Sequence, residues 1–150
     1  MFVIKFIDEL FVEAEVGEKG RMGLLRLNEH VERFVAHTVN WSELEYAEHW
    51  ISALLRVLEG KPSALITDML FPSESSHLVW WPMWRVGDEL VFQNQLLFFK
   101  QHGIKGAILN ADQLYELIGV HRSYDGDNNR LSEWRVAVAD VQEFITKARV

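Results

Sequence analysis

Cysteine is absent from this chain of 150 residues, and its formal charge is −7. Without cysteine the fold has neither disulfides nor a thiolate-bound metal, which is typical of a reducing cytoplasm. The opening MFVIKFIDELF lacks a basic region followed by a long apolar run, and no stretch approaches 18 apolar residues. The sequence therefore predicts a cytoplasmic protein with neither a secretory signal nor a membrane-spanning helix.

Motifs for catalysis and metal binding are also missing. The chain has no GxSxG, GxGxxG or P-loop pattern, and its histidines form no HExxH or HxH pair. A calcium loop starting at Asp125 fails, because Arg130 and Val136 stand where glycine and glutamate are required. Asp125, Asp127 and Glu133 suit a glycosidase pair, but polar turns usually contain such residues. We therefore expect no enzyme, no cofactor and no metal site.

A basic stripe is lacking as well, since lysine and arginine are scattered singly. Proteins that bind nucleic acid normally use such a stripe to neutralise phosphates. Nucleic acid is therefore a poor partner, whereas a basic protein matches the negative charge of the chain. One alternative stays open, in which tryptophans stack on the bases of a single-stranded nucleic acid.

Large rings are abundant, with six tryptophans and nine phenylalanines. The clearest element is a helix over residues 42–59, where Ser42 and Glu45 form a capping box. Trp41 and Tyr46 occupy the positions of a hydrophobic staple. The helical spacing predicts that the buried face consists of Leu44, Ala47, Trp50, Ile51, Leu54, Leu55 and Leu58.

The remaining elements indicate an α+β protein. Strands are expected over 9–17, 21–27, 31–39, 63–71 and 130–138, and helices over 110–119 and 140–148, the last with Asp140 and Glu143 as a capping pair. Residues 17–20 are expected to form a turn. The length fits one domain over 1–150. This order predicts an antiparallel or mixed β-sheet with helices packed on one face.

A hairpin is expected over residues 77–99, with Gly87 and Asp88 as its two-residue turn. This turn sets the register, which places Val86 opposite Glu89, Trp84 opposite Val91, Pro82 opposite Gln93, and Trp80 opposite Gln95. One face is expected to be core and carries Val79, Trp81, Met83, Leu90, Phe92, Leu96 and Phe98. Because Pro82 cannot donate a ladder hydrogen bond, we also expect an edge or a bulge there.

The other face of the hairpin is the candidate binding surface. Trp80 and Trp84 lie there beside Gln93 and Gln95, a composition typical of a protein-binding hot spot. The competing interpretation is that a helix or the N-terminal strands cover this face. Asp125 and Asp127 form an acidic corner that suits a basic partner, although the residue types favour the competing interpretation, a plain solvated turn.

Four segments in order resemble a known family. They are Trp41–Gly60, with the pattern W…Y…HW…AL…L.G, then SALITDM at 63–69, VFQNQLLF at 91–98 and DGDNNRLSEW at 125–134. This set resembles the immunity proteins of bacterial contact-dependent growth inhibition systems, the CdiI group. It is most similar to the type paired with a colicin-like nuclease that cleaves small-subunit ribosomal RNA, and it covers roughly Thr38 to Lys147.

The resemblance implies a small cytoplasmic immunity protein that blocks the toxin domain of a neighbour's effector. It also implies a twisted, mainly antiparallel sheet with helices packed on it. The partner it implies is the C-terminal nuclease domain of the cognate toxin, usually a basic protein. The residues expected to bind the toxin are Trp80, Trp84, Gln93, Gln95, Asp125 and Asp127. The DGDNNRLSEW segment is expected to be mainly structural, turning the chain so that Trp134 packs under the sheet.

Overall fold

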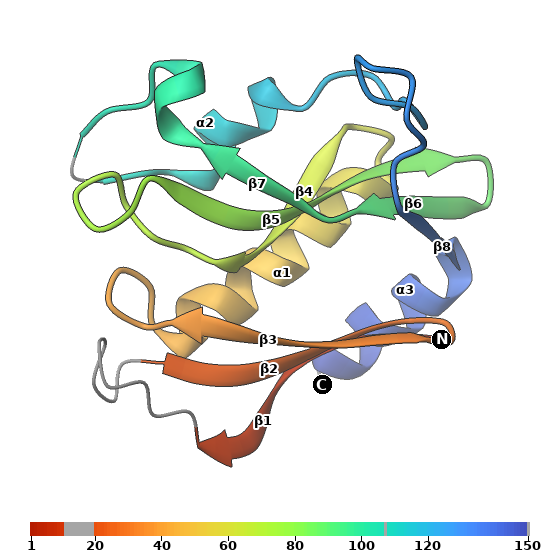
Figure 1. Ribbon diagram of the computed structural model, residues 1–150. Coiled ribbons are helices and arrows are strands. Elements are labelled where there is room, and N and C mark those ends of the chain that lie inside the picture. Colours follow the sequence, from red (N-terminus) through yellow and green to blue (C-terminus); the bar gives the residue numbers. More distant parts are fainter. Residues whose placement is uncertain (11–19, 107, 150) are drawn as a thin grey trace.

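The computed structural model describes residues 1–10, 20–106 and 108–149, and its strands form two antiparallel sheets (Figure 1). The first sheet has the order β1-β2-β3, with β1 (Phe2–Leu10), β2 (Gly20–Leu27) and β3 (His30–His37). The second has the order β4-β5-β6-β8, with β7 also paired to β5; its strands are β4 (Ser63–Asp68), β5 (His77–Val86), β6 (Glu89–Gln93), β7 (Gln95–Phe98) and β8 (Glu133–Ala137). The predicted α+β class with antiparallel strands is confirmed. The turn predicted at 17–20 and most of the strand predicted over 9–17 lie outside the described residues.

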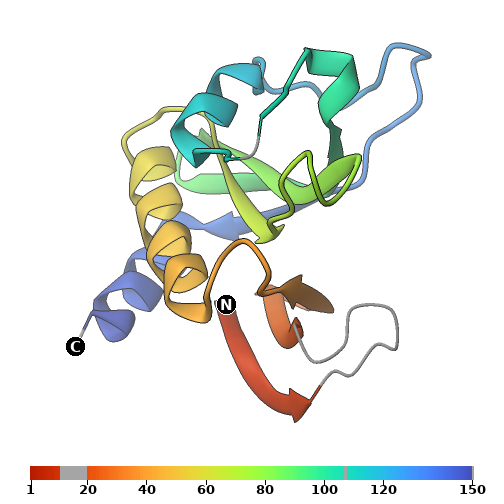
Figure 2. The ribbon, with the colours of Figure 1, turned by 90° about the vertical axis from the view of Figure 1, so that its left-hand side faces the viewer.

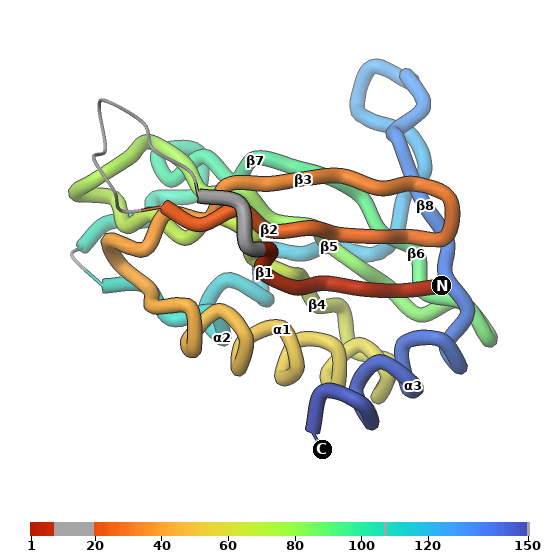
Figure 3. The backbone as a smooth tube through the Cα atoms, turned by 90° about the horizontal axis from the view of Figure 1, so that it is seen from below, coloured from red at the N-terminus to blue at the C-terminus, as the bar shows by residue number. Residues whose placement is uncertain are grey.

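Helices and loops lie on both sides of the five-stranded sheet. Its lower side faces the β1–β3 sheet and the two longer helices, α1 (Glu43–Leu58) and α3 (Val138–Ala148), and Figure 3 shows these helices beside β1. Its upper side is covered by residues 99–106 and 108–132, which contain η1 (Phe99–His102), α2 (Ala111–Leu114) and η2 (Tyr115–Leu117), as Figure 2 shows. No helix within the described ranges is long and apolar enough to cross a membrane.

The capping box and the staple of α1 form as predicted. The Glu45 backbone N–H donates to the Ser42 hydroxyl (3.2 Å), and the Ser42 N–H donates to the Glu45 carboxylate (3.1 Å). The ring of Trp41 meets that of Tyr46 edge-on at 5.3 Å. Local sequence therefore determines where this helix begins.

The predicted buried face of α1 is partly wrong. The buried residues are Tyr46, His49, Trp50, Ala53, Leu54 and Val57. Leu44 is 66% exposed, Leu55 is 37% exposed, and Ala47 is also exposed. The helix carries two apolar stripes, and the buried one holds rings whose polar atoms find partners in the core. Tyr46, for example, donates to the His37 carbonyl (2.7 Å) and accepts from the Met69 N–H (2.8 Å).

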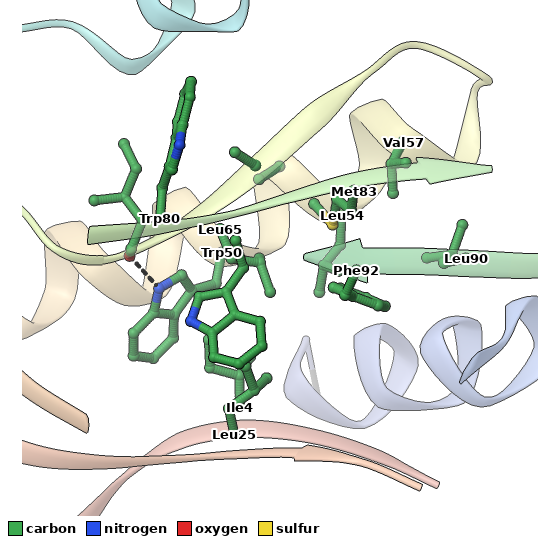
Figure 4. Close-up of a cluster of buried hydrophobic side chains, with 14 of the residues drawn as sticks. Ile4, Leu25, Trp50, Leu54, Val57, Leu65, Trp80, Met83, Leu90 and Phe92 are labelled. Atoms are coloured by element: carbon green, nitrogen blue, oxygen red, sulfur yellow. Dashed lines mark hydrogen bonds between the residues drawn. The ribbon is translucent and has the colours of Figure 1, made fainter. Parts of the chain in front are cut away.

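Those partners include the free edge of β4, the outer strand of its sheet. The Ile66 N–H donates to His49 Nε2 (2.9 Å), and the Trp50 indole N–H donates to the Ile66 carbonyl (2.9 Å; Figure 4). An uncovered edge strand leaves backbone groups unpaired and invites further strand pairing. Helix α1 thus satisfies the β4 edge with side chains, and this requirement selects the face that it buries.

The hairpin register is confirmed. Val86 pairs with Glu89 and Trp84 with Val91, and the same register continues into β7, where Trp80 pairs with Gln95. The ladder is interrupted between β6 and β7, opposite Pro82, which has no N–H to donate.

The predicted core face of the hairpin is right at one end only. Trp81, Met83, Leu90 and Phe92 are buried, but Leu96 and Phe98 are 49% and 39% exposed. At that end Leu78 and Leu97 are buried on the opposite face, because the chain returns over it after β7 and buries Phe99. Side-chain alternation places Leu96 and Phe98 correctly on one face but does not say which face is covered.

The described strands β1, β2 and β3 contribute directly to the core, although the resemblance seen in the sequence begins only at about Thr38. Buried Ile4 and Leu25 face the five-stranded sheet from below (Figure 4), and Phe2 is buried in the same core. The Phe2 ring stacks on Phe92 at 5.8 Å between centroids. Full burial of one such side chain is worth about 1.5–3 kcal/mol. Removal of the first sheet would therefore expose the lower face of the second.

The C-terminal elements differ in their boundaries. The helix expected over 110–119 is divided into α2 and η2 and ends at Leu117. Helix α3 begins at Val138, and the predicted Asp140 capping pair is wrong: the N-cap is Ala137, which makes no side-chain cap hydrogen bond. Strand β8 runs directly into α3, and the Val138 N–H donates instead to the Asp88 carbonyl (2.8 Å).

Candidate functional site

Five of the six residues predicted to bind a partner line one cleft of about 320 Å³. Its floor is formed by strands β5, β6 and β7 and carries Trp80, Trp84, Gln93 and Gln95. Residues 117–120 and the corner at Asp125 form its walls. Asp127, the sixth predicted residue, is exposed and does not line the cleft.

The two tryptophans form the floor of the cleft and do not project from the surface. Trp80 is 3% exposed and Trp84 is 9% exposed. The indole N–H of Trp84 donates to the Gly119 carbonyl (2.9 Å), whereas the Trp80 Nε1 is buried without a hydrogen-bond partner among the described residues. Residues 119–122 cover this face at Trp84 and Gln93, because the His121 ring lies 5.2 Å from that of Trp84 and the Arg122 carbonyl accepts from the Gln93 amide. Rings placed in this way cannot stack on successive bases, which disfavours the single-stranded nucleic-acid alternative.

A hydrogen-bonded network fixes the cleft wall to the sheet. The Gln95 amide donates to the Gln93 side-chain oxygen (2.8 Å), and the Gln93 amide donates to the Glu133 carboxylate (2.8 Å). His121 Nε2 lies 2.6 Å from the same carboxylate, and the Ser123 hydroxyl lies 3.3 Å from its second oxygen. The network joins β6, β7 and β8 to the loop that covers the tryptophans, so it positions the rim of the cleft.

Glu133 is the charged centre of this network. Burial raises the pKa of the Glu133 carboxyl, but hydrogen bonds from Gln93, His121 and Ser123, together with the nearby His121 charge, hold that pKa below its ordinary value overall. Glu133 is therefore an ionised acceptor at neutral pH. A glycosidase acid needs the opposite shift, because it must hold a proton to donate.

The acidic corner is a hydrogen-bonded turn. The Asp125 carboxylate accepts from the backbone N–H groups of Asp127 and Asn129, each at 2.9 Å. These bonds, that from Asn129 above all, hold the pKa of the fully exposed Asp125 carboxyl below its usual value. Asn128 takes the left-handed backbone with φ of 62°, which asparagine tolerates well. Within the described ranges no group of three or more metal-ligating side chains occurs.

Trp134, the last residue of the DGDNNRLSEW segment, supports the structural role expected for that segment. Trp134 stacks on His30 at 4.4 Å between ring centroids and lies 5.3 Å from Trp81. The corner therefore turns the chain into β8 so that Trp134 packs between the two sheets.

The exposed rim of the cleft was not predicted from the sequence. Val120 is 80% exposed, Tyr124 is 50% exposed and Leu117 is 36% exposed, and all three line the cleft. They come from an irregular segment without periodicity, so no pattern marks them. A rim of exposed apolar side chains around a floor of tryptophan and glutamine is a composition that suits binding of another protein.

Comparison with known proteins agrees with the resemblance seen in the sequence. The model of the CdiI N-terminal domain family matches residues 36–144. The immunity protein CdiI of Enterobacter cloacae subsp. cloacae is 24% identical over 130 residues, which cover 85% of this chain and 86% of that protein. A chain in the solved CdiA-CT/CdiI toxin and immunity complex from Enterobacter cloacae shares the fold, with a TM-score of 0.84, 21% identity and 99% coverage of both chains.

The match to the family model spans α1, the whole five-stranded sheet, the cleft and most of α3. It leaves out almost all of the β1–β3 sheet, as the resemblance in the sequence does. The chain belongs to the CdiI N-terminal domain family, the immunity proteins of contact-dependent growth inhibition.

Proposed function

We propose that this protein binds and neutralises the C-terminal toxin domain of the CdiA protein encoded beside it. Membership of the CdiI family carries this proposal, and the related Enterobacter fold occurs in a toxin and immunity complex. The net charge of −7 suits a basic partner.

The mechanism is steric occlusion of a nuclease, most simply a ribonuclease. The immunity protein covers the active surface of the toxin or the surface on which RNA docks. To protect a cell, the complex needs nanomolar or tighter affinity, which corresponds to about −12 kcal/mol. No chemical step by the immunity protein is required.

The cleft is the proposed contact surface. Trp80, Trp84 and Gln93 shape its floor, while exposed Gln95 and Asp125 are within reach of a partner. Asp127 extends the same corner outward and adds to the electrostatic attraction. Reversing the charge of both aspartates is therefore expected to slow association and to make binding less sensitive to salt.

The experiment is calorimetry with the purified toxin domain and two matched valine variants. Val120→Asp places a charge on the cleft rim, whereas Val31→Asp places one on β3, where Val31 is 48% exposed. Val120→Asp is expected to weaken binding by about 2 kcal/mol, roughly 30-fold in Kd, and Val31→Asp by much less. Equal affinities would remove the cleft from the interface, and no binding by the wild type would refute the function itself.

A further inference from the structure

A second hollow lies between the N-terminal half of α1 and residues 108–112. This groove has a volume of about 410 Å³. Glu45 and Glu48 form one wall, Ile108 and Asp112 form the other, and Trp41 and His49 lie at its base.

All the charged side chains that line the groove are acidic. Three carboxylates line it, and no lysine or arginine does. Glu45 already accepts from the Ser42 N–H, but within the described ranges neither the Glu48 nor the Asp112 carboxylate has a hydrogen bond or an ion pair. His49 provides no compensating charge, because burial lowers its pKa to about 3.

Apolar side chains line the same groove. Ile108 is 79% exposed, and Leu44, one helical turn before Glu48 on α1, is 66% exposed. The partly buried Trp41 packs against His49 at 5.0 Å between ring centroids. Lysine and arginine carry apolar stems below their charged heads, so they match a surface that mixes apolar groups with carboxylates.

We propose that this groove docks a lysine- or arginine-rich segment of the toxin domain, with cationic groups on Glu48 and Asp112 and side-chain stems along Trp41 and Ile108. This inference rests on the proposed function. A second copy of the chain is a poor occupant, because a symmetric contact would bring the same carboxylates together. Tyr115 of η2 lines the groove and Leu117 of the same short helix lines the cleft, so one interface of about 800 Å² per partner can include both.

The test compares two double variants that change the net charge equally. The groove variant is Glu48→Lys with Asp112→Lys, and the control is Glu29→Lys with Glu74→Lys, at exposed positions outside both the groove and the cleft. Association with the CdiA toxin domain encoded beside this chain is measured by surface plasmon resonance at low and high ionic strength. The milder Glu48→Gln with Asp112→Asn provides a second groove variant, and circular dichroism checks that each variant folds.

We expect the groove variant to associate about tenfold more slowly than the control at low ionic strength, with the difference shrinking at high salt. The milder variant should fall between them. Equal rates for the groove variant and the control would overturn the docking site while leaving toxin binding intact. The docking site would also be overturned if the free chain self-associates and the groove variant, but not the control, abolishes this self-association. A second copy of the chain would then be the occupant of the groove. A wild type that does not bind the toxin domain would instead refute the proposed function.

Discussion

Buried His49 should make the folding stability of this protein depend on pH. It lies on α1 with 8% of its surface exposed, and its Nε2 accepts the Ile66 N–H at 2.9 Å. Protonation would remove this acceptor and place a charge in the core, so burial lowers the pKa of His49 from 6.5 to about 3. Between these two pH values the unfolded chain binds more protons than the folded chain at this residue. Stability from His49 is therefore complete above pH 6.5 and is lost as the pH falls toward 3.

The magnitude follows from the two pKa values. Each pH unit between them is worth about 1.4 kcal/mol, so lowering the pH from about 7.5 to about 5 should remove roughly 2 kcal/mol of stability through His49. In His49→Gln a neutral amide oxygen can still accept from Ile66, but nothing titrates at that position. The variant should therefore lack this 2 kcal/mol loss, although it will be somewhat less stable than the wild type at neutral pH.

Urea unfolding of both proteins at the two pH values measures the effect. The two proteins differ only at position 49, so the contributions of all other residues cancel in the difference. The reasoning would be refuted if the wild type and His49→Gln lost the same free energy of unfolding on acidification.

Three further substitutions test other parts of the structure. Ser42→Ala removes the α1 cap and should lower the free energy of urea unfolding by about 1 kcal/mol; no loss would mean that Glu45 alone caps the helix. Glu133→Gln should cost about 1–3 kcal/mol at neutral pH, because it breaks the cleft network. Ionised Glu133 stabilises the fold above its unfolded pKa, so that cost should shrink as the pH falls through the lowered folded pKa; a pH-independent cost would contradict this. Trp84→Phe removes the donor to Gly119 and should speed hydrogen exchange over residues 117–122, and unchanged exchange would show that this bond does not anchor the cover.

Local features of the fold could be predicted because short stretches of sequence determine them. The Ser42–Glu45 capping box and the Gly87 turn, with its positive φ of 63°, set a helix start and a strand register without help from the rest of the chain. The buried face of α1 could not be predicted, because two apolar stripes compete and the choice depends on the edge of β4. Exposure of Leu96 likewise depends on where the chain returns after β7.

The candidate site, too, could be predicted only where neighbouring residues in the sequence determine it. The register brought Trp80 and Gln95 opposite each other, and the structure places both in one cleft. The partners that complete the site come from distant segments: Gln93 and Glu133, for example, are 40 positions apart. The groove beside α1 was not predicted, because Glu45 and Glu48 on one wall are typical of a solvated helix face. Ile108 on the other wall comes from a loop without a pattern.

The most direct test of the account is the activity of the neighbouring CdiA toxin domain on RNA, titrated with this protein. The account predicts a stable complex with nanomolar or tighter Kd and complete loss of RNA cleavage at about one equivalent of immunity protein. A toxin domain that cleaves RNA at its full rate in the presence of excess immunity protein, with no complex formed, would contradict the account.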